Sequence, residues 1–204
     1  MAGSDMTPVI ISDEVALDAN GISTVAAVGN NAALTINGAL ASGGSVTNAS
    51  GRQVTILSSA DDTAISFTIV GTDVNGDSLT ESLTGADAAA TATSSGYFKT
   101  ITSITAVGDP AGNCTAGINA NALGVVFAGR TRLRAFSIVS GGTAGIVSMR
   151  NASATGTVKM QARTLGTDNT TEDAWIPEEG VLYPDGCYVT WAVPITDMMM
   201  FYHA

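Results

Sequence analysis

The stretch from Arg52 to Gly85 has the pattern of two strands joined by a turn. Apolar side chains fall at every other position, at Ile65, Phe67 and Ile69, which is the period of a strand with one face in a core. The segment from Asp73 to Gly76 then has Asp at the first and Gly at the fourth position of a type I turn. This pattern predicts an antiparallel β-hairpin.

The register of this hairpin depends on the length of its loop. A two-residue loop would send the apolar residues of the two strands to opposite faces. A three-residue loop, Val74 to Gly76, sets Phe67 opposite Leu83 and Gly71 opposite Leu79, so that the apolar residues share a face. We therefore predict a bulged hairpin with its Gly in the left-handed conformation.

The composition extends the β expectation to the whole chain of 204 residues. Only 13% of residues are charged and 5% are aromatic, while Gly, Ala, Ser and Thr alternate with Val, Ile and Leu. That mixture is typical of short strands and many turns, and helix signals are nearly absent. We expect an all-β fold of two small antiparallel β-sandwich or jelly-roll-like domains with little helix.

The distribution of charge predicts where the chain divides. Residues 1–129 hold two basic and eleven acidic residues, for a net charge of −9, whereas residues 130–204 hold six and seven, for −1. We expect a β-sandwich over 20–125, built around the hairpin of residues 52–85, and a second small β-sandwich or jelly roll over 130–204. Residues 1–19 are expected to form an N-terminal arm, which either pairs with a neighbour or is a disordered tail.

The second half opens with Arg130, Arg132 and Arg134 at every other position, so on a strand all three side chains leave from one face. This row is a solvated face, a contact with the acidic first domain of the same or a neighbouring subunit, or a contact with an acidic partner. The four aromatic residues that follow are expected in the core or at subunit contacts: Trp175, Tyr183, Tyr188 and Trp191. The candidate interface residues are Arg130, Arg132, Arg134, Trp175 and Tyr183.

Charge and spacing argue against several kinds of chemistry. The net charge of −10 argues against binding nucleic acid, because neutralising phosphates takes clustered Lys and Arg. The single histidine, His203, lies next to the C-terminus, so a Ser-His-Asp or Cys-His arrangement would depend on a frayed residue. Cys114 and Cys187 lack a CxxC spacing and are expected to be buried free thiols. We expect no catalytic, cofactor or metal site.

Two further patterns favour simple explanations. Asp73, Asn75 and Asp77 superficially resemble half of a calcium loop, but the pattern fails at Ser78 and Thr84, so a plain hairpin turn is expected. The N-terminus has no basic region before an apolar one, and the longest apolar runs are too short to span a bilayer. We expect a soluble protein that is made in a cytoplasm and has no membrane contact.

The central stretch resembles the β-rich structural proteins of tailed-bacteriophage and prophage virion modules. The shared run is Arg-x-Val-Thr, Phe-Thr-Ile-x-Gly-Thr-Asp, a Gly-containing turn, Thr-Glu and then Phe-Lys-Thr before an Ile-Thr segment. The later sequence GVLYPDGCYVTWAV is similar to the end of small phage β domains, in which a Gly-x-x-x-x-x-Gly element precedes a last pair of strands. The resemblance covers most of residues 50–204.

This resemblance implies a virion component without enzymatic activity, made in the host bacterial cytoplasm. The expected function is that of a capsid decoration (cement) protein, which stabilises the phage head by binding the major capsid protein or another virion protein as a homo-oligomer, for example a trimer. A tail, neck or fibre subunit is the alternative within the virion. From another class, a carbohydrate-binding adhesin would use Trp175, Trp191 and nearby Tyr on an exposed face, and it fails if these aromatics are buried.

Overall fold

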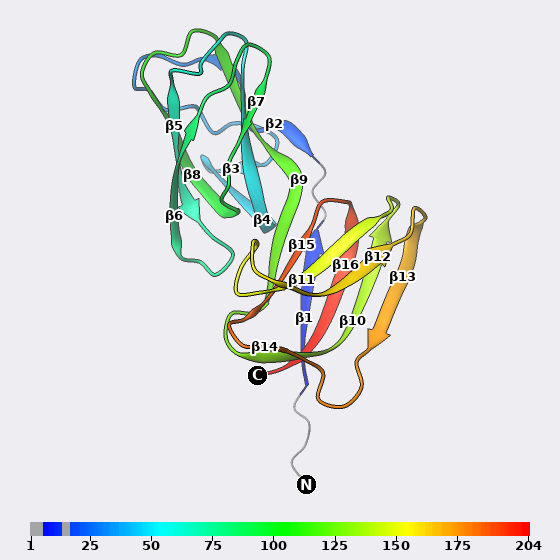
Figure 1. Ribbon diagram of the computed structural model, residues 1–204. Coiled ribbons are helices and arrows are strands. Elements are labelled where there is room, and N and C mark those ends of the chain that lie inside the picture. The colour runs from blue at the N-terminus through cyan, green and yellow to red at the C-terminus, as the bar shows by residue number, and fades with distance from the viewer. Residues whose placement is uncertain (1–5, 14–16) are drawn as a thin grey trace. The chain divides into compact units, whose positions relative to one another are not determined.

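The computed structural model describes residues 6–13 and 17–204, and its ribbon is drawn in Figure 1. These residues form sixteen strands and no helix, so they also contain no helix that could cross a membrane. The strand pairings are antiparallel. The predicted all-β fold of small β-sandwich or jelly-roll-like domains is confirmed.

The chain divides into two compact units. One is Ala16–Ala120, which we call the inserted unit, and the other joins Met1–Val15 to Asn121–Ala204, which we call the jelly-roll unit. Strand β9 (Asn113–Phe127) runs through the boundary without a break. The two units divide between Ala120 and Asn121, several residues before the predicted division between 125 and 130. The change of composition near residue 130 coincides with the start of the next strand, at Thr131.

Within the predicted N-terminal arm of residues 1–19, Thr7–Asp13 belong to a sheet of the same chain, whereas residues 1–5 and 14–16 lie outside the described residues. Strand β1 (Thr7–Asp13) pairs along its length with β16 (Ile195–His203) of the same chain. The physical reason is burial, because Ile11 is only 7% exposed and packs in the core of the jelly-roll unit. At the other end of the predicted arm, Asp18 already begins β2 of the inserted unit.

A five-stranded sheet and four strands of the larger second sheet build the jelly-roll unit. The first sheet has the order β1-β16-β10-β13, with β14 pairing beside β10. The second sheet has the order β12-β11-β15-β9 within this unit. The other strands of this unit are β10 (Thr131–Gly141), β11 (Gly145–Asn151), β12 (Val158–Thr164), β13 (Asp168–Trp175), β14 (Val181–Tyr183) and β15 (Cys187–Trp191).

The path of the chain between these sheets is that of a jelly roll. Strands β1, β9, β10 and β11 alternate between the two sheets, β11 and β12 form a hairpin, and β13, β15 and β16 alternate again. Eight strands wound in this way form the two Greek keys of a jelly roll. Their inward side chains meet in one core that includes Ile138, Met198, Met200, Val147 and Val189.

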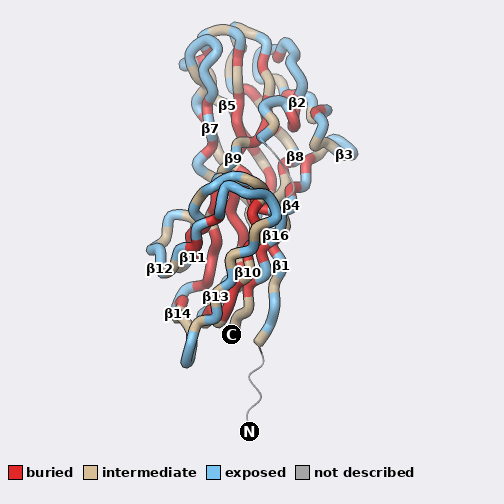
Figure 2. The backbone as a smooth tube through the Cα atoms, turned by 90° about the vertical axis from the view of Figure 1, so that its right-hand side faces the viewer, coloured by how far each residue is buried: buried red, intermediate tan, exposed pale blue. Residues whose placement is uncertain are grey.

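The inserted unit is organised around the long strand β4 (Ser45–Ser58). This strand pairs with β8 (Phe98–Val107) in its first half, with β7 (Thr91–Thr93) in its second half, and also with β9. Strands β5 (Ser66–Thr72) and β6 (Ser78–Thr84) extend the sheet beyond β8, β2 (Asp18–Ala27) pairs with β9, and β3 (Ala41–Ser42) pairs with the start of β4. In Figure 2 the buried positions follow these strands and the exposed positions gather in the connections.

The predicted central hairpin is confirmed in its register. Strands β5 and β6 set Phe67 opposite Leu83 and Gly71 opposite Leu79. The loop between them has three residues and ends in Gly76, whose φ of +89° is left-handed. Glycine is also required at position 71, because a Cβ there would lie 1.9 Å from the carbonyl oxygen of Thr100 on β8.

Candidate interaction surface

The five residues predicted to form an interface come together around the first half of β10. Arg130 lies directly before this strand and is exposed, and Arg132 and Arg134 lie within it. Trp175, at the end of β13, is opposite Ala135 of β10. Tyr183, at the end of β14, is opposite Thr131 of the same strand. Segments distant in sequence thus meet at one place.

The arginine row is interrupted by a β-bulge. The pairing of β10 with β16 shifts register between Leu133 and Ala135, so Arg134 is the extra residue and leaves the regular alternation. Its Nε is buried and has no hydrogen-bond partner among the described residues. Arg132 keeps the predicted outward position and pairs with Glu179, with 3.0 Å between Nη2 and Oε2.

Tyr183 belongs to the core and not to a surface. Its side chain is fully buried, and the pKa of its hydroxyl is raised by burial and by the nearby Cys187 thiol. The sequence could not show this, because a three-residue strand gives too little alternation to assign an inner face.

The two cysteines are free and buried, as predicted. Cys187 packs in the core of the jelly-roll unit, where burial raises its pKa to about 12. Cys114, in the inserted unit, lies 3.8 Å from a carboxylate oxygen of Asp62, and burial together with that carboxylate raises its pKa. Thiols with raised pKa values are poor nucleophiles, so both have the properties of packing residues.

The other aromatic residues of the jelly-roll unit divide sharply by exposure. Trp191 is 3% exposed and Tyr188 is 7% exposed, whereas Trp175 is 63% exposed. Together with Tyr183, three of the four aromatics are therefore buried. An aromatic platform for a sugar ring would have to be built on Trp175 without them.

The first sheet has an outer face whose side chains can be assigned from the register. Because Ile11, Ile138, Met198 and Met200 point into the core, their neighbours in sequence point outward. The pairings arrange these outward residues in four rows across the strands, and we call them together the outer face. Row 1 is His203, Arg132 and Leu182; row 2 is Pro8, Phe201, Ala135 and Trp175; row 3 is Ile10, Met199, Ser137 and Asp173; row 4 is Ser12, Asp197, Val139 and Thr171.

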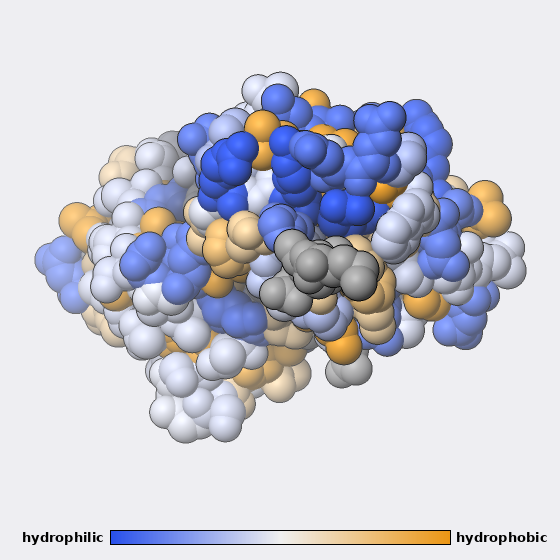
Figure 3. Space-filling view, turned by 90° about the horizontal axis from the view of Figure 1, so that it is seen from below, coloured by the Kyte–Doolittle hydropathy of each residue, from blue (hydrophilic) through white to orange (hydrophobic). Residues whose placement is uncertain are grey.

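The middle of the outer face is apolar and exposed. Of the eight side chains in rows 2 and 3, six are apolar. Ile10 is 62% exposed, Met199 37% and Trp175 63%. Figure 3 views the molecule from below and shows hydrophobic residues scattered among hydrophilic ones on that side. Contiguous exposed apolar groups are common at contact sites, so this face is the candidate interaction surface.

The outer face of the second sheet carries hydrogen-bonded polar side chains as well as Ile146, which is 38% exposed. Arg150 donates from Nε to the hydroxyl of Thr190 at 2.9 Å and from Nη1 to the carbonyl of Gly156 at 3.1 Å. Gln161 donates from its amide to the hydroxyl of Ser148 at 3.0 Å. The hydrogen-bonding groups of these side chains therefore have partners within the same sheet and its connections.

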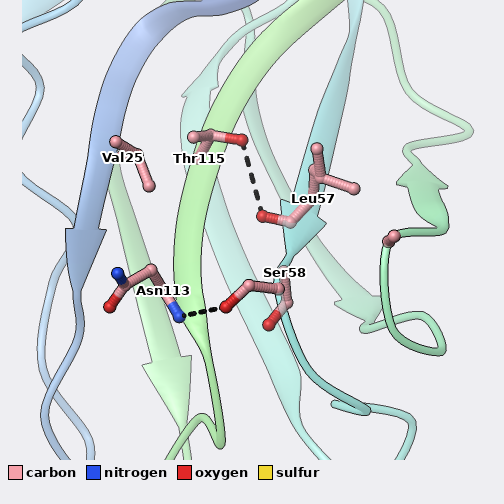
Figure 4. Close-up of a pocket in the computed structure, with 7 residues that line it drawn as sticks. Val25, Leu57, Ser58, Asn113 and Thr115 are labelled. Atoms are coloured by element: carbon pink, nitrogen blue, oxygen red, sulfur yellow. Dashed lines mark hydrogen bonds between the residues drawn. The ribbon is translucent and has the colours of Figure 1, made fainter.

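The inserted unit contains an apolar pocket of about 250 Å³, shown in Figure 4. The hydroxyl of Thr115 donates to the carbonyl of Leu57, and the hydroxyl of Ser59 accepts from the backbone amide of Asn113. Polar groups in the wall are therefore used by the protein itself. None of the lining residues is acidic, basic or a nucleophilic thiol: Val25, Leu57, Ser58, Ser59, Ala89, Asn113 and Thr115.

The remaining polar residues singled out in the sequence have structural roles. The carboxylate of Asp73 accepts from the backbone amides of Asn75 and Asp77 at 2.8 and 3.0 Å, which closes the hairpin turn. His203 is exposed, and its backbone carbonyl accepts from Thr131. Within residues 6–13 and 17–204, no group of three or more His, Cys, Asp or Glu side chains is placed to hold a metal ion.

Comparison with known proteins gives no significant match to any family model, curated protein or solved structure. The function is therefore argued from the fold and from the outer face.

Proposed function

We propose that this protein is a non-enzymatic structural component of a bacteriophage virion, and specifically a capsid decoration (cement) protein that stabilises the head. The observation that carries the proposal is the jelly-roll unit with its exposed apolar outer face. Jelly rolls recur in viral capsid domains and in lectins, so the fold narrows the choice by analogy to these two classes.

The burial of the aromatic residues favours the virion class over the lectin class. Sugar-binding sites stack exposed aromatic rings on the apolar face of a sugar. Here Tyr183, Tyr188 and Trp191 are buried, and Trp175 is the exposed member of the four. A carbohydrate-binding adhesin is therefore the weaker candidate, and it now depends on Trp175.

The apolar outer face suits a protein that works by assembly. A chain that leaves a sheet face uncovered gains stability when a partner covers it, and binding to the assembled state then stabilises that state by mass action. The resemblance of residues 50–204 to virion proteins agrees with this mechanism. The proposed partners are further copies of this chain, in a homo-oligomer, and the major capsid protein, with a tail, neck or fibre protein as the alternative to the capsid protein.

Co-sedimentation with purified phage particles tests the proposal. The wild-type protein is mixed with empty capsids of the encoding phage and, separately, with its purified tails. Binding to capsids in a fixed ratio, with increased resistance of the capsids to heat, is the expected result. Binding to tails alone would move the protein to the tail or neck. Binding to neither, together with glycan binding that is lost in Trp175→Ala, would replace the proposal with the adhesin.

A further inference from the structure

The outer face of the first sheet has opposite charges at its two ends as well as an apolar middle. We propose that this face docks on the same face of a second copy of the chain, with each strand antiparallel to its counterpart, and so forms a dimer with twofold symmetry. The proposal rests on the homo-oligomer of the proposed function and assigns the outer face to the second copy, so that capsid contacts fall on other surfaces of the chain; the dimer itself needs no capsid.

The apolar middle gives the dimer its contact area. Two residues of an extended strand rise about 6.6 Å, so the four rows span about 20 Å along the strands. Rows 2 and 3 occupy the centre and hold the exposed Ile10, Met199 and Trp175. A centre that is more apolar than its polar rim is the usual arrangement of a protein interface.

The charges lie at the edges of this patch, with Asp173 at the β13 edge of row 3 and the others in rows 1 and 4. Row 1 carries Arg132 and the exposed His203, and row 4 carries the exposed Asp197. Arg132 is paired with Glu179, whose side chain is 79% exposed, and Asp197 accepts from the hydroxyl of Ser12 at 3.3 Å. Exposed pairs of this kind are weak, and a guanidinium has five N–H donors, so both charges remain able to take a further partner.

The charge pattern selects one orientation of the second copy. An axis across the strands lays each strand on its counterpart and brings row 1 of one copy onto row 4 of the other, so that His203 lies over Asp197 and Arg132 lies over Val139, the neighbour of Asp197. The same rotation sets row 2 on row 3, where Phe201 meets Met199 and, at the β13 edge, Trp175 meets Asp173. An axis along the strands would instead bring Arg132 onto the row that carries Arg132 in the second copy, and juxtaposed like charges disfavour an interface. The antiparallel arrangement is self-complementary, as a twofold contact requires.

Light scattering of the purified chain without capsids tests the dimer, and an apolar-to-lysine pair of variants tests its surface. The expected mass at micromolar concentration and low salt is twice the 20.5 kDa of one chain. Met199→Lys is expected to weaken dimerisation about tenfold or more, because it buries a charge at the centre of the contact. Val158→Lys, at an equally exposed 37% on the second sheet, is the matched control and is expected to leave the dimer intact.

A charge swap tests the orientation. Arg132→Glu and Asp197→Arg alone are each expected to weaken the dimer several-fold, and the double variant is expected to restore it, since each copy then presents the exchanged charges. A partner other than a second copy would not be restored by this swap.

A wild-type monomer at every concentration would overturn the proposal, as would a trimer or a double variant that stays dissociated. Because light scattering is done without capsids, the absence of a dimer can be distinguished from the absence of capsid binding in the co-sedimentation experiment. Both single charge variants lie on the surface, so they keep the test valid if Met199→Lys fails to fold.

Discussion

The two sheets of the jelly-roll unit share one core but turn very different faces outward. On the second sheet, Arg150 and Gln161 donate hydrogen bonds to Thr190 and Ser148 of neighbouring strands. On the first sheet, the middle of the outer face is a row of exposed apolar side chains, with Met199 in its centre. The same alternation of residues therefore gives one sheet an outer face with several side-chain hydrogen bonds and the other an outer face with a larger group of exposed apolar side chains.

The difference between faces can be followed in three consecutive methionines. Met198 and Met200 are fully buried between the sheets, whereas Met199 is 37% exposed on the outer face. Residue type is constant here and only the direction of the side chain changes. In this unit, whether an apolar residue lies in the core or on the surface depends on which face of the strand its side chain points to.

Truncating these methionines gives the largest expected contrast. Met200→Ala removes a fully buried side chain and is expected to lower the free energy of unfolding by about 2–5 kcal/mol. Met199→Ala is expected to change the stability of the monomer by less than about 0.5 kcal/mol. Urea denaturation at low protein concentration measures both. Equal losses would mean that the outer face is already packed within the monomer.

A dependence of stability on alkaline pH tests the shared core. The pKa of Cys187 is about 12 in the folded protein against 9.0 in a free thiol, because burial favours the neutral form. Between these values the unfolded chain has lost a proton that the folded chain keeps, so raising the pH favours unfolding. Stability is fully present below pH 9 and falls by at most about 1.4 kcal/mol per pH unit from this thiol above it.

Denaturation in urea between pH 8 and pH 11 measures this slope, with Cys187→Ala as the control. The variant is expected to lose the contribution of Cys187 to the slope above pH 9, while Cys114, whose pKa is also raised, keeps its own contribution. A residual slope above pH 10 is expected from Tyr183, whose hydroxyl pKa is raised in the same direction by burial. An unchanged slope in the variant would show that the thiol does not titrate in this way.

Removing side-chain hydrogen bonds on the outer side of the second sheet is expected to have a smaller effect. Arg150→Ala loses the contacts to Thr190 and Gly156 and is expected to cost about 1–2 kcal/mol of unfolding free energy. Arg132→Ala on the outer face loses an exposed ion pair with Glu179 and is expected to cost less than about 1 kcal/mol. A larger cost for Arg132 would place its main role inside the monomer.

Sequence predicted best what depends on neighbouring residues. The register of the central hairpin followed from alternation and from Gly76, because the loop length fixes the pairing of two adjacent strands. The burial of Cys114 and Cys187 followed from the general behaviour of free thiols. The pattern of Cys187, Val189 and Trp191 on one face also agrees with their common place in the core.

Long-range pairing could not be predicted from local patterns. Strand β1 joins β16 from the opposite end of the chain, and no local pattern specifies that pairing. The bulge at Arg134 arises where β10 pairs with β16, so the regular spacing of the arginines in the sequence could not predict it. The outer face was missed for the same reason, since alternation identifies which residues share a side of one strand but not which strands lie together.

The last contrast substitutes the same residue on the two faces. Ser137→Leu adds an apolar side chain to row 3 of the outer face, where no contact depends on the hydroxyl in the described structure, and is expected to strengthen dimerisation a few-fold. Gln161→Leu removes the hydrogen bond to the largely buried Ser148 and is expected to cost about 0.5–1.5 kcal/mol of stability without changing the mass in solution. Light scattering and urea denaturation of both variants separate the two effects. If Gln161→Leu also promoted association, one added apolar side chain on either sheet would be enough to drive dimerisation. The outer face of the first sheet would then not be the specific dimer surface.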